Sequence, residues 1–176
     1  MNSNLFLLFY FNLLMFEFKC KKTLVCVRCG DCCHIRQSNL VKISNEEDYK
    51  IRKKVYENTG IIYLEPLKNY TISISKEEKE RMEKKAKELG VKIKILPKKI
   101  VINKSKTKAE IIDYYVDHDV CPFLKGKAFC RIYEDRPTVC RIFPHVMKQD
   151  TINPSILVDK NSNFDSVLKK AKELTR

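Results

Sequence analysis

The stretches CVRCGDCC at 26–33 and CPFLKGKAFCRIYEDRPTVCRIFP at 121–144 decide how this chain must fold. In the first stretch, the Cys-x-x-Cys-Gly spacing lets two thiolates converge on one metal ion, and the glycine relieves crowding at the turn. Its three evenly spaced cysteines also match the opening of a bacterial-type ferredoxin motif, in which thiolates hold neighbouring irons of one cluster. The second stretch starts with Cys-Pro, which is typical of the remote ligand in such sites. Because the second stretch supplies this remote ligand and two further cysteines, we expect the two stretches to meet in space.

The cysteines of these stretches are the candidate metal ligands: Cys26, Cys29, Cys32, Cys33, Cys121, Cys130 and Cys140. Seven thiols exceed what a four-ligand site takes, which implies spare thiols or a site with an open position. Neighbouring side chains in extended backbone point to opposite faces, so we expect Cys32 and Cys33 not to take equivalent places around one ion. For the three histidines we expect hydrogen-bonding or surface roles rather than ligation. In a reducing cytoplasm, metal binding is favoured over disulfide pairing.

A thiolate-rich site carries negative charge, which nearby cations should offset. Several basic residues lie within a few positions of a candidate ligand, namely Arg28, Lys125, Lys127, Arg131, Arg136 and Arg141. Part of the basic excess of the chain therefore has a local explanation. The segment IYEDRP at 132–137 also predicts a tight turn, in which Arg136 bonds backbone carbonyls or thiolates, with plain packing as the equal alternative.

Composition and charge narrow the function further. The 176 residues are 44% hydrophobic and 32% charged, which fits one globular domain. A formal charge of +13 points to acidic partners. Residues 76–108 hold thirteen Lys and Arg against five Glu but no aromatic side chain on which bases could stack, so nucleic acid is not the favoured partner. The four glycines are too scattered for a phosphate-binding loop, and there is no His-Glu-x-x-His motif.

Local patterns predict a small α+β domain with short helices and a few short strands organised around the cysteine site. Two capping boxes start helices, Ser44 with Glu47 and Ser75 with Glu78, and we expect these helices to end at glycines 60 and 90. The alternating run at 91–96 and the β-rich run at 99–103 predict a small hairpin or edge pair, and a third apolar run follows at 111–117. A short helix is expected after Asn163 or Asp165.

We divide the chain into an apolar leader at 1–18, a cysteine-cluster domain at 19–148 with a Lys-rich insert at about 61–117, and a tail at 149–176. As a helix the apolar run at 5–18 would be about 21 Å long, which is short for a membrane span of ~30 Å. It also lacks a positive start and a cleavage site. We expect translation to start at Met15, a cytoplasmic location, and membrane association only if the leader is present.

The two stretches, with the capped segment that follows the first, resemble the YkgJ-like cysteine-cluster proteins. These are described as zinc- or iron-chelating and also as iron-sulfur-cluster proteins. The resemblance covers 26–60 and 121–144, about a third of the chain. It implies that the seven candidate cysteines are the family's motif cysteines and that the framework around them is Pro122, Phe123, Leu124, Ile132, Tyr133, Arg136, Pro137, Arg141 and Pro144. Cys20 lies outside this set, so we expect it not to ligate.

Three functions follow from these patterns. The first is a protein that carries an iron-sulfur cluster, with an electron-transfer or redox-linked role, as a component of an oxidoreductase with an unknown redox or protein partner. The second is a module with structural Zn²⁺ that contacts nucleic acid or an acidic protein through its basic surface. The third is a thiol redox or protein-methylation enzyme that works through one of the adjacent cysteines, Cys32 or Cys33. The methylation role is what the resemblance implies, because the family also resembles the cysteine-rich part of flagellin lysine methylases.

Overall fold

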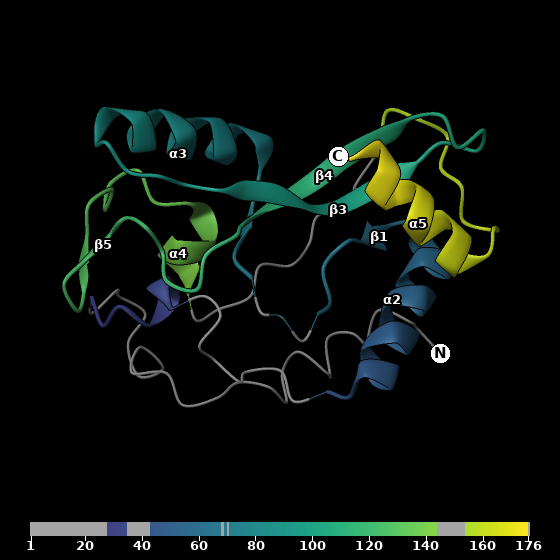
Figure 1. Cartoon of the computed structure of the whole chain (residues 1–176), viewed down its shortest axis with the longest axis horizontal. Coiled ribbons are helices and arrows are strands. Elements are labelled where there is room, and N and C mark those ends of the chain that lie inside the picture. The colour runs from purple at the N-terminus through teal and green to yellow at the C-terminus, as the bar shows by residue number, and fades with distance from the viewer. Residues whose placement is uncertain (1–27, 35–42, 68, 70, 144–153, 176) are drawn as a thin grey trace.

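A long antiparallel ribbon of two strands, β3 (Ile95–Ile102) and β4 (Ala109–Val116), runs through the middle of the molecule (Figure 1). The computed structural model describes residues 28–34, 43–67, 69, 71–143 and 154–175. Two short strands extend the ribbon to a sheet of order β1-β3-β4-β2, and a separate two-stranded hairpin follows it. These shorter strands are β1 (Ile62–Tyr63), β2 (Ser73–Ile74), β5 (Leu124–Lys125) and β6 (Phe129–Cys130).

The described helices are η2 (Asp31–Cys33, a 3-10 turn), α2 (Asn45–Thr59), α3 (Lys76–Glu88), α4 (Thr138–Ile142) and α5 (Phe164–Leu174). Both predicted capping boxes are present at the starts of α2 and α3. Gly60 ends α2 in the left-handed conformation, at φ 75°. Asn163 caps α5 by accepting a hydrogen bond from the backbone N–H of Ser166. The α+β class is confirmed.

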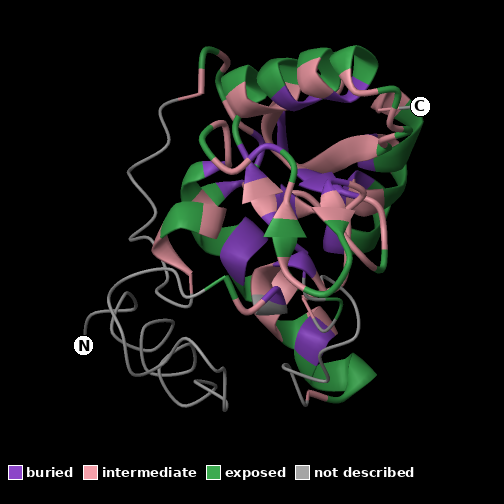
Figure 2. Cartoon of the chain, turned by 90° about the vertical axis from the view of Figure 1, so that its left-hand side faces the viewer, coloured by how far each residue is buried: buried purple, intermediate pink, exposed green. Residues whose placement is uncertain are grey.

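Two hydrophobic cores lie at opposite ends of the ribbon. The helix-end core, beneath α2 and α5, consists of Tyr56, Ile62, Ile100, Ile102, Phe164, Val167 and Ala171. The cysteine-end core, beneath α3, consists of Ile72, Ile74, Met82, Ala86, Val116, Phe123 and Ile132. Figure 1 shows α2 and α5 together at one end and α3, α4 and β5 at the other. Seen from the cysteine end, α3 turns its buried side inward and its exposed side to solvent (Figure 2).

The predicted hairpin or edge pair between 91–96 and 99–103 is wrong. Residues 95–102 form one strand, β3, which passes through Pro97 and pairs with β4. The register shifts between Pro97 and Lys99 and again between Lys99 and Ile100. Proline cannot donate to a ladder but is tolerated at a bulge, so it does not end the strand here. The partner of β3 is therefore the third run of the sequence, and the Lys-rich insert builds the whole four-stranded sheet.

Within the described residues, no helix combines the length and the apolar character that crossing a membrane requires. The apolar leader and the predicted start at Met15 lie outside these residues. So do Cys20 and Cys26.

Candidate metal centre

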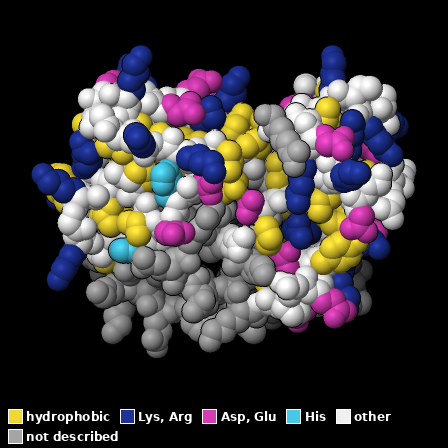
Figure 3. All heavy atoms as spheres, in the orientation of Figure 1, with side chains coloured by type: hydrophobic (Ala, Val, Ile, Leu, Met, Phe, Trp, Pro, Cys, Tyr) yellow, Lys and Arg dark blue, Asp and Glu magenta, His cyan; other side chains and the backbone are white. Residues whose placement is uncertain are grey.

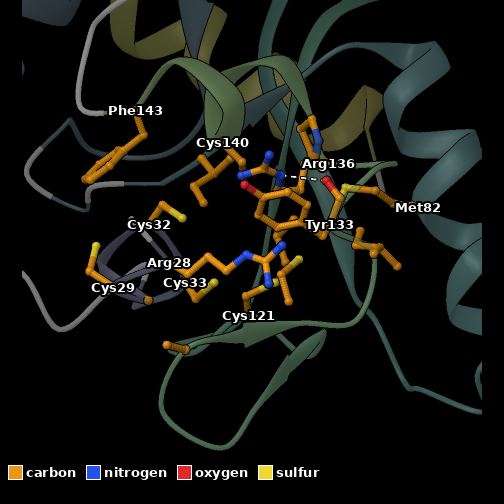
Figure 4. A pocket seen from close by; sticks show the side chains of 17 residues that line it. Arg28, Cys29, Cys32, Cys33, Met82, Cys121, Tyr133, Arg136, Cys140 and Phe143 are labelled. Carbon is orange, nitrogen blue, oxygen red and sulfur yellow. Dashed lines mark hydrogen bonds between the residues drawn. The ribbon is translucent and has the colours of Figure 1, made fainter. Parts of the chain in front are cut away.

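Six cysteine thiols line one pocket at the cysteine end of the ribbon (Figure 4). They are Cys29, Cys32, Cys33, Cys121, Cys130 and Cys140. The pocket has a free volume of about 40 Å³. Of the seven candidate ligands, the remaining one, Cys26, lies outside the described residues. The fold thus gathers thiols from both cysteine-rich stretches, as the sequence predicts.

Backbone contacts join the two stretches directly. The N–H of Cys121 donates to the carbonyl of Cys33 at 2.6 Å, and the N–H of Cys33 donates to the carbonyl of Gly30 at 2.8 Å. Gly30 has φ 83°, and a Cβ placed on it would lie 2.5 Å from the carbonyl oxygen of Lys127. A side chain at position 30 would therefore meet the β5–β6 turn, so the glycine permits the close approach of the two stretches.

The prediction for the adjacent pair Cys32 and Cys33 is wrong in its premise. Their backbone is the 3-10 turn η2 and not an extended strand, so it does not send the two side chains to opposite faces. Both thiols line the pocket. They also contact each other through a side-chain hydrogen bond.

The thiols perturb one another strongly. Hydrogen bonds from Cys140 and Cys33, with help from the positive charge of Arg136, lower the pKa of Cys32 to about 3. A hydrogen bond from Cys33 lowers the pKa of Cys121 below its ordinary value. The donors respond in the opposite sense, because hydrogen bonding to Cys121 and Cys32 raises the pKa of Cys33, and hydrogen bonding to Cys32 raises that of Cys140. A chain of contacts thus runs from Cys140 through Cys32 and Cys33 to Cys121.

This donor chemistry fits a metal. Burial and mutual repulsion make it unfavourable for several thiols in a half-buried pocket to be deprotonated at once. A bound cation offsets this cost. Soft thiolate ligands select zinc and iron-sulfur clusters over harder cations. In the described residues, however, no three Cys, His, Asp or Glu side chains already stand in the arrangement of a metal shell. The thiols are gathered into one pocket and linked in pairs.

Two arginines enclose the aromatic ring at the pocket wall. The guanidinium carbons of Arg28 and Arg136 lie 4.3 Å and 3.5 Å from the centre of the Tyr133 ring. All three residues line the pocket, and they lie together in Figure 4. The Nε of Arg136 donates to the carbonyl of Tyr133 at 2.6 Å, so of the two alternatives for the turn at IYEDRP the structure has the arginine-to-carbonyl bond. Positive charge therefore stands next to the thiols.

Cys140 lies on α4, a helix whose N-terminus is capped from another helix. The N-cap residue of α4, Pro137, supplies no side-chain hydrogen bond. The carboxylate of Glu78 on α3 provides the cap, accepting from the N–H and the hydroxyl of Thr138, both at 2.7 Å. The other oxygen of Glu78 accepts from the N–H of Ser75 in the capping box of α3. One carboxylate thus joins the Lys-rich insert to the cysteine motif.

The insert also supplies part of the pocket wall, which the sequence analysis does not predict. Ile72, Met82 and Val116 line the pocket beside the thiols. No motif spacing marks these residues, and the apolar positions of α3 indicate only a buried face. They keep one side of the pocket apolar.

One of the two described histidines, His118, has the hydrogen-bonding role that the sequence predicts. The Nε2 of His118 accepts a hydrogen bond from the N–H of Lys94 at 2.9 Å. His34 does not line the thiol pocket, and within the described residues its buried Nδ1 has no hydrogen-bond partner. His145 lies outside the described residues.

Comparison with known proteins identifies one family. The family model CxxCxxCC, described as "Putative zinc- or iron-chelating domain", matches residues 25–165, which is 141 of the 176 residues. The match includes the seven candidate cysteines and the insert between them. No curated protein and no solved structure matches the chain.

Proposed function

This chain belongs to the CxxCxxCC family of zinc- or iron-chelating domains, as its resemblance to the YkgJ-like proteins predicts, and on that premise we propose that its thiol pocket holds an iron-sulfur cluster. The protein would then pass electrons to or from a partner. The observation that carries the proposal is the number of thiols at one pocket. Six described cysteines line it, two more than the four ligands of a structural zinc.

The cluster ligands would come from the seven motif cysteines, because cysteine thiolates are the usual ligands of iron-sulfur clusters. When bound, such a cluster supplies one-electron transfer at a potential that its surroundings set. The chain contributes those surroundings. Arg28 and Arg136 place positive charge beside the thiolates, which offsets the net negative charge of a four-thiolate cluster. Ile72 and Met82 limit the access of water, which also affects the potential.

A second candidate is a single Zn²⁺ ion with a structural role. The free volume of about 40 Å³ favours it, because this space suits one ion better than a cluster of several irons and sulfides. Under this reading four of the thiols close a tetrahedral site, and the function lies in what the basic surface contacts.

Metal analysis distinguishes the two candidates. The full chain is purified without oxygen, and iron, sulfide and zinc are measured together with the visible absorption spectrum. We expect iron and sulfide in similar amounts and broad absorbance near ~400 nm. About one zinc per chain with no colour would contradict the cluster and support the zinc site.

A further inference from the structure

We propose that the outer face of the β5–β6 hairpin docks an acidic partner protein beside the thiol pocket. This surface, the hairpin face, consists of Arg28, Lys125, Lys127, Phe129 and Arg131. The inference rests on the proposed function in one respect, because the docked protein would be the electron partner.

The hairpin has two faces of opposite character. Leu124 pairs with Cys130, and Lys125 pairs with Phe129. Directly paired residues share one face of an antiparallel pair, and consecutive residues alternate between faces. Cys130 lines the thiol pocket, so the face of the hairpin that carries Leu124 and Cys130 is directed toward that pocket. Lys125 and Phe129 therefore lie on the opposite face. Phe129 is 58% exposed, so its ring is available for a docked protein to bury.

The charges of the hairpin face all have one sign. From Pro122 to Tyr133 every charged residue is basic. Within the described part of the chain, the four cations of the hairpin face form no ion pair with an acidic side chain. Figure 3 shows Lys and Arg side chains along the edge of the molecule where Figure 1 places β5. A partner with carboxylates would complement this face and be steered toward it.

A hollow beside the hairpin gives a docked partner access to the site. It has a volume of about 320 Å³ and is lined partly by Arg28, Phe129 and Arg131. Four of its lining residues also line the thiol pocket, namely Arg28, Cys130, Ile132 and Tyr133. The hollow and the pocket therefore share a wall, and a partner seated in the hollow would contact the residues around the metal.

Acidic residues form the remaining edge of the hollow. Asp135 lies 3.3 Å from the Nζ of Lys85, which balances its charge, and Glu134 is exposed. Among the described residues no cation pairs with the Glu134 carboxylate, and this one charge at the edge would fix the orientation of an acidic partner without cancelling four cations.

The Lys-rich helix α3 is a poorer docking surface. Lys79 pairs with Glu83 at 3.0 Å, and Lys85 pairs with Glu88 at 3.2 Å, so some of its charge is balanced within the helix. Its sequence holds no aromatic residue. Aromatic and arginine side chains contribute most of the binding energy at protein interfaces, and the hairpin face has both. A single exposed ring also suits a protein better than single-stranded nucleic acid, which needs successive stacking platforms.

The test uses a chemical probe of defined composition. A fluorescein-labelled peptide of fifteen residues, rich in Glu and Asp with two Leu, is titrated by anisotropy with the metal-loaded full chain at low salt. We expect the double variant K125E/K127E to bind about tenfold more weakly and F129S about threefold more weakly. The matched control K84E/K87E on α3 has the same change of net charge, and we expect it to bind within about twofold of the wild type. Far-ultraviolet circular dichroism and metal content confirm that each variant is folded.

Three outcomes would overturn the docking proposal. The first is equal weakening by the two double variants, which would mean that only net charge matters. The second is unchanged binding by K125E/K127E. The third is tighter binding of a labelled RNA of fifteen nucleotides that is lost in K125E/K127E, which would make the surface a nucleic-acid site. Failure of the proposed function is distinguishable from these outcomes. A chain that takes up zinc but no iron or sulfide would contradict the cluster, and the peptide titration with that chain would still test the docking surface.

Discussion

The two ends of the β3–β4 ribbon differ in the side chains that form their cores. The helix-end core is apolar and aromatic, and the rings of Tyr56 and Phe164 pack with their centres 5.7 Å apart beneath two helices of 15 and 11 residues. The cysteine-end core merges into the thiol pocket, where partly buried cysteines pack against its apolar side chains. The 13-residue helix α3 covers this core on one side, and the elements that carry the cysteines are short, with strands of two residues and a helix of five.

This difference indicates what holds each end together. Long helices over an apolar core are stable through burial of their apolar faces. Two-residue strands and a five-residue helix contribute little by themselves, so β5, β6 and α4 at the cysteine end depend on links between distant segments. A metal bound by thiols from both stretches would be such a link, and its binding free energy would also be folding free energy for that end. The helix end should fold without it.

Loss of a ligand should produce the largest difference between the two ends. Cys29→Ser removes one thiol of a Cys-x-x-Cys pair, and we expect loss of the bound metal, since a structural zinc site can contribute ~10 kcal/mol or more. Hydrogen exchange should accelerate in β5, β6 and α4 and stay slow in α2 and α5. Metal content per chain and amide exchange by mass spectrometry measure both effects.

The control for this prediction is Cys20→Ser, which we expect to retain the metal. Equal metal content in the two variants would contradict the assignment of the motif cysteines. Uniform acceleration of exchange in both ends would show instead that the ribbon couples them into one cooperative unit.

A substitution in the helix-end core should leave the metal bound. Phe164 is 2% exposed and packs against Tyr56, so Phe164→Ala should lower the free energy of unfolding of the helix end by about 3 kcal/mol through lost burial and a cavity. Metal content should stay at the wild-type value. Urea unfolding and elemental analysis test this, and a parallel loss of metal would mean that the two ends are not separable.

A pair of glycine variants probes the approach of the two stretches. Gly30 and Gly126 both have positive φ, at 83° and 63°, but only Gly30 has a neighbour within reach of a new Cβ, the Lys127 carbonyl at 2.5 Å. Gly126→Ala should cost about 1 kcal/mol of conformational strain. Gly30→Ala should cost about 1 to 3 kcal/mol more and weaken metal retention, because the stretches must move apart. Thermal unfolding and chelator challenge compare them, and equal effects would contradict the close contact.

Local features of the fold are predictable from the sequence, and distant pairings are not. The capping boxes at Ser44 and Ser75 and the cap at Asn163 act within one turn, so their residues suffice to place α2, α3 and α5. The pairing of β3 with β4 depends on tertiary context, which also allows a strand to continue through Pro97. In the site, cysteine spacing indicates which thiols gather. It does not indicate that Met82 would complete the wall.

The contact between Glu78 and Thr138 is the clearest example of a feature that the sequence does not predict, and a substitution of Glu78 gives the smallest predicted effect. Its role in the capping box of α3 is visible in the sequence, but its bond to Thr138 spans 60 residues and needs the fold. Burial alone would raise the pKa of Glu78, but hydrogen bonds from Thr138 and Ser75 outweigh it and hold that pKa below its ordinary value of 4.5. The ionised carboxylate therefore stabilises the fold fully above pH 4.5, and this contribution is lost as the pH falls through the lowered pKa of Glu78.

Glu78→Gln should cost about 1 kcal/mol in the free energy of unfolding, as expected for a weakened helix cap, and should speed the release of metal to a chelator. Its control is Glu83→Gln on the same helix, where the carboxylate pairs only with Lys79 across one turn at the surface, and we expect no change in release rate. The stability difference between Glu78→Gln and the wild type should narrow as the pH falls below 4.5. Equal release rates in the two variants would show that α3 does not position Cys140, and the cysteine end would then owe its shape to the metal and the motif alone.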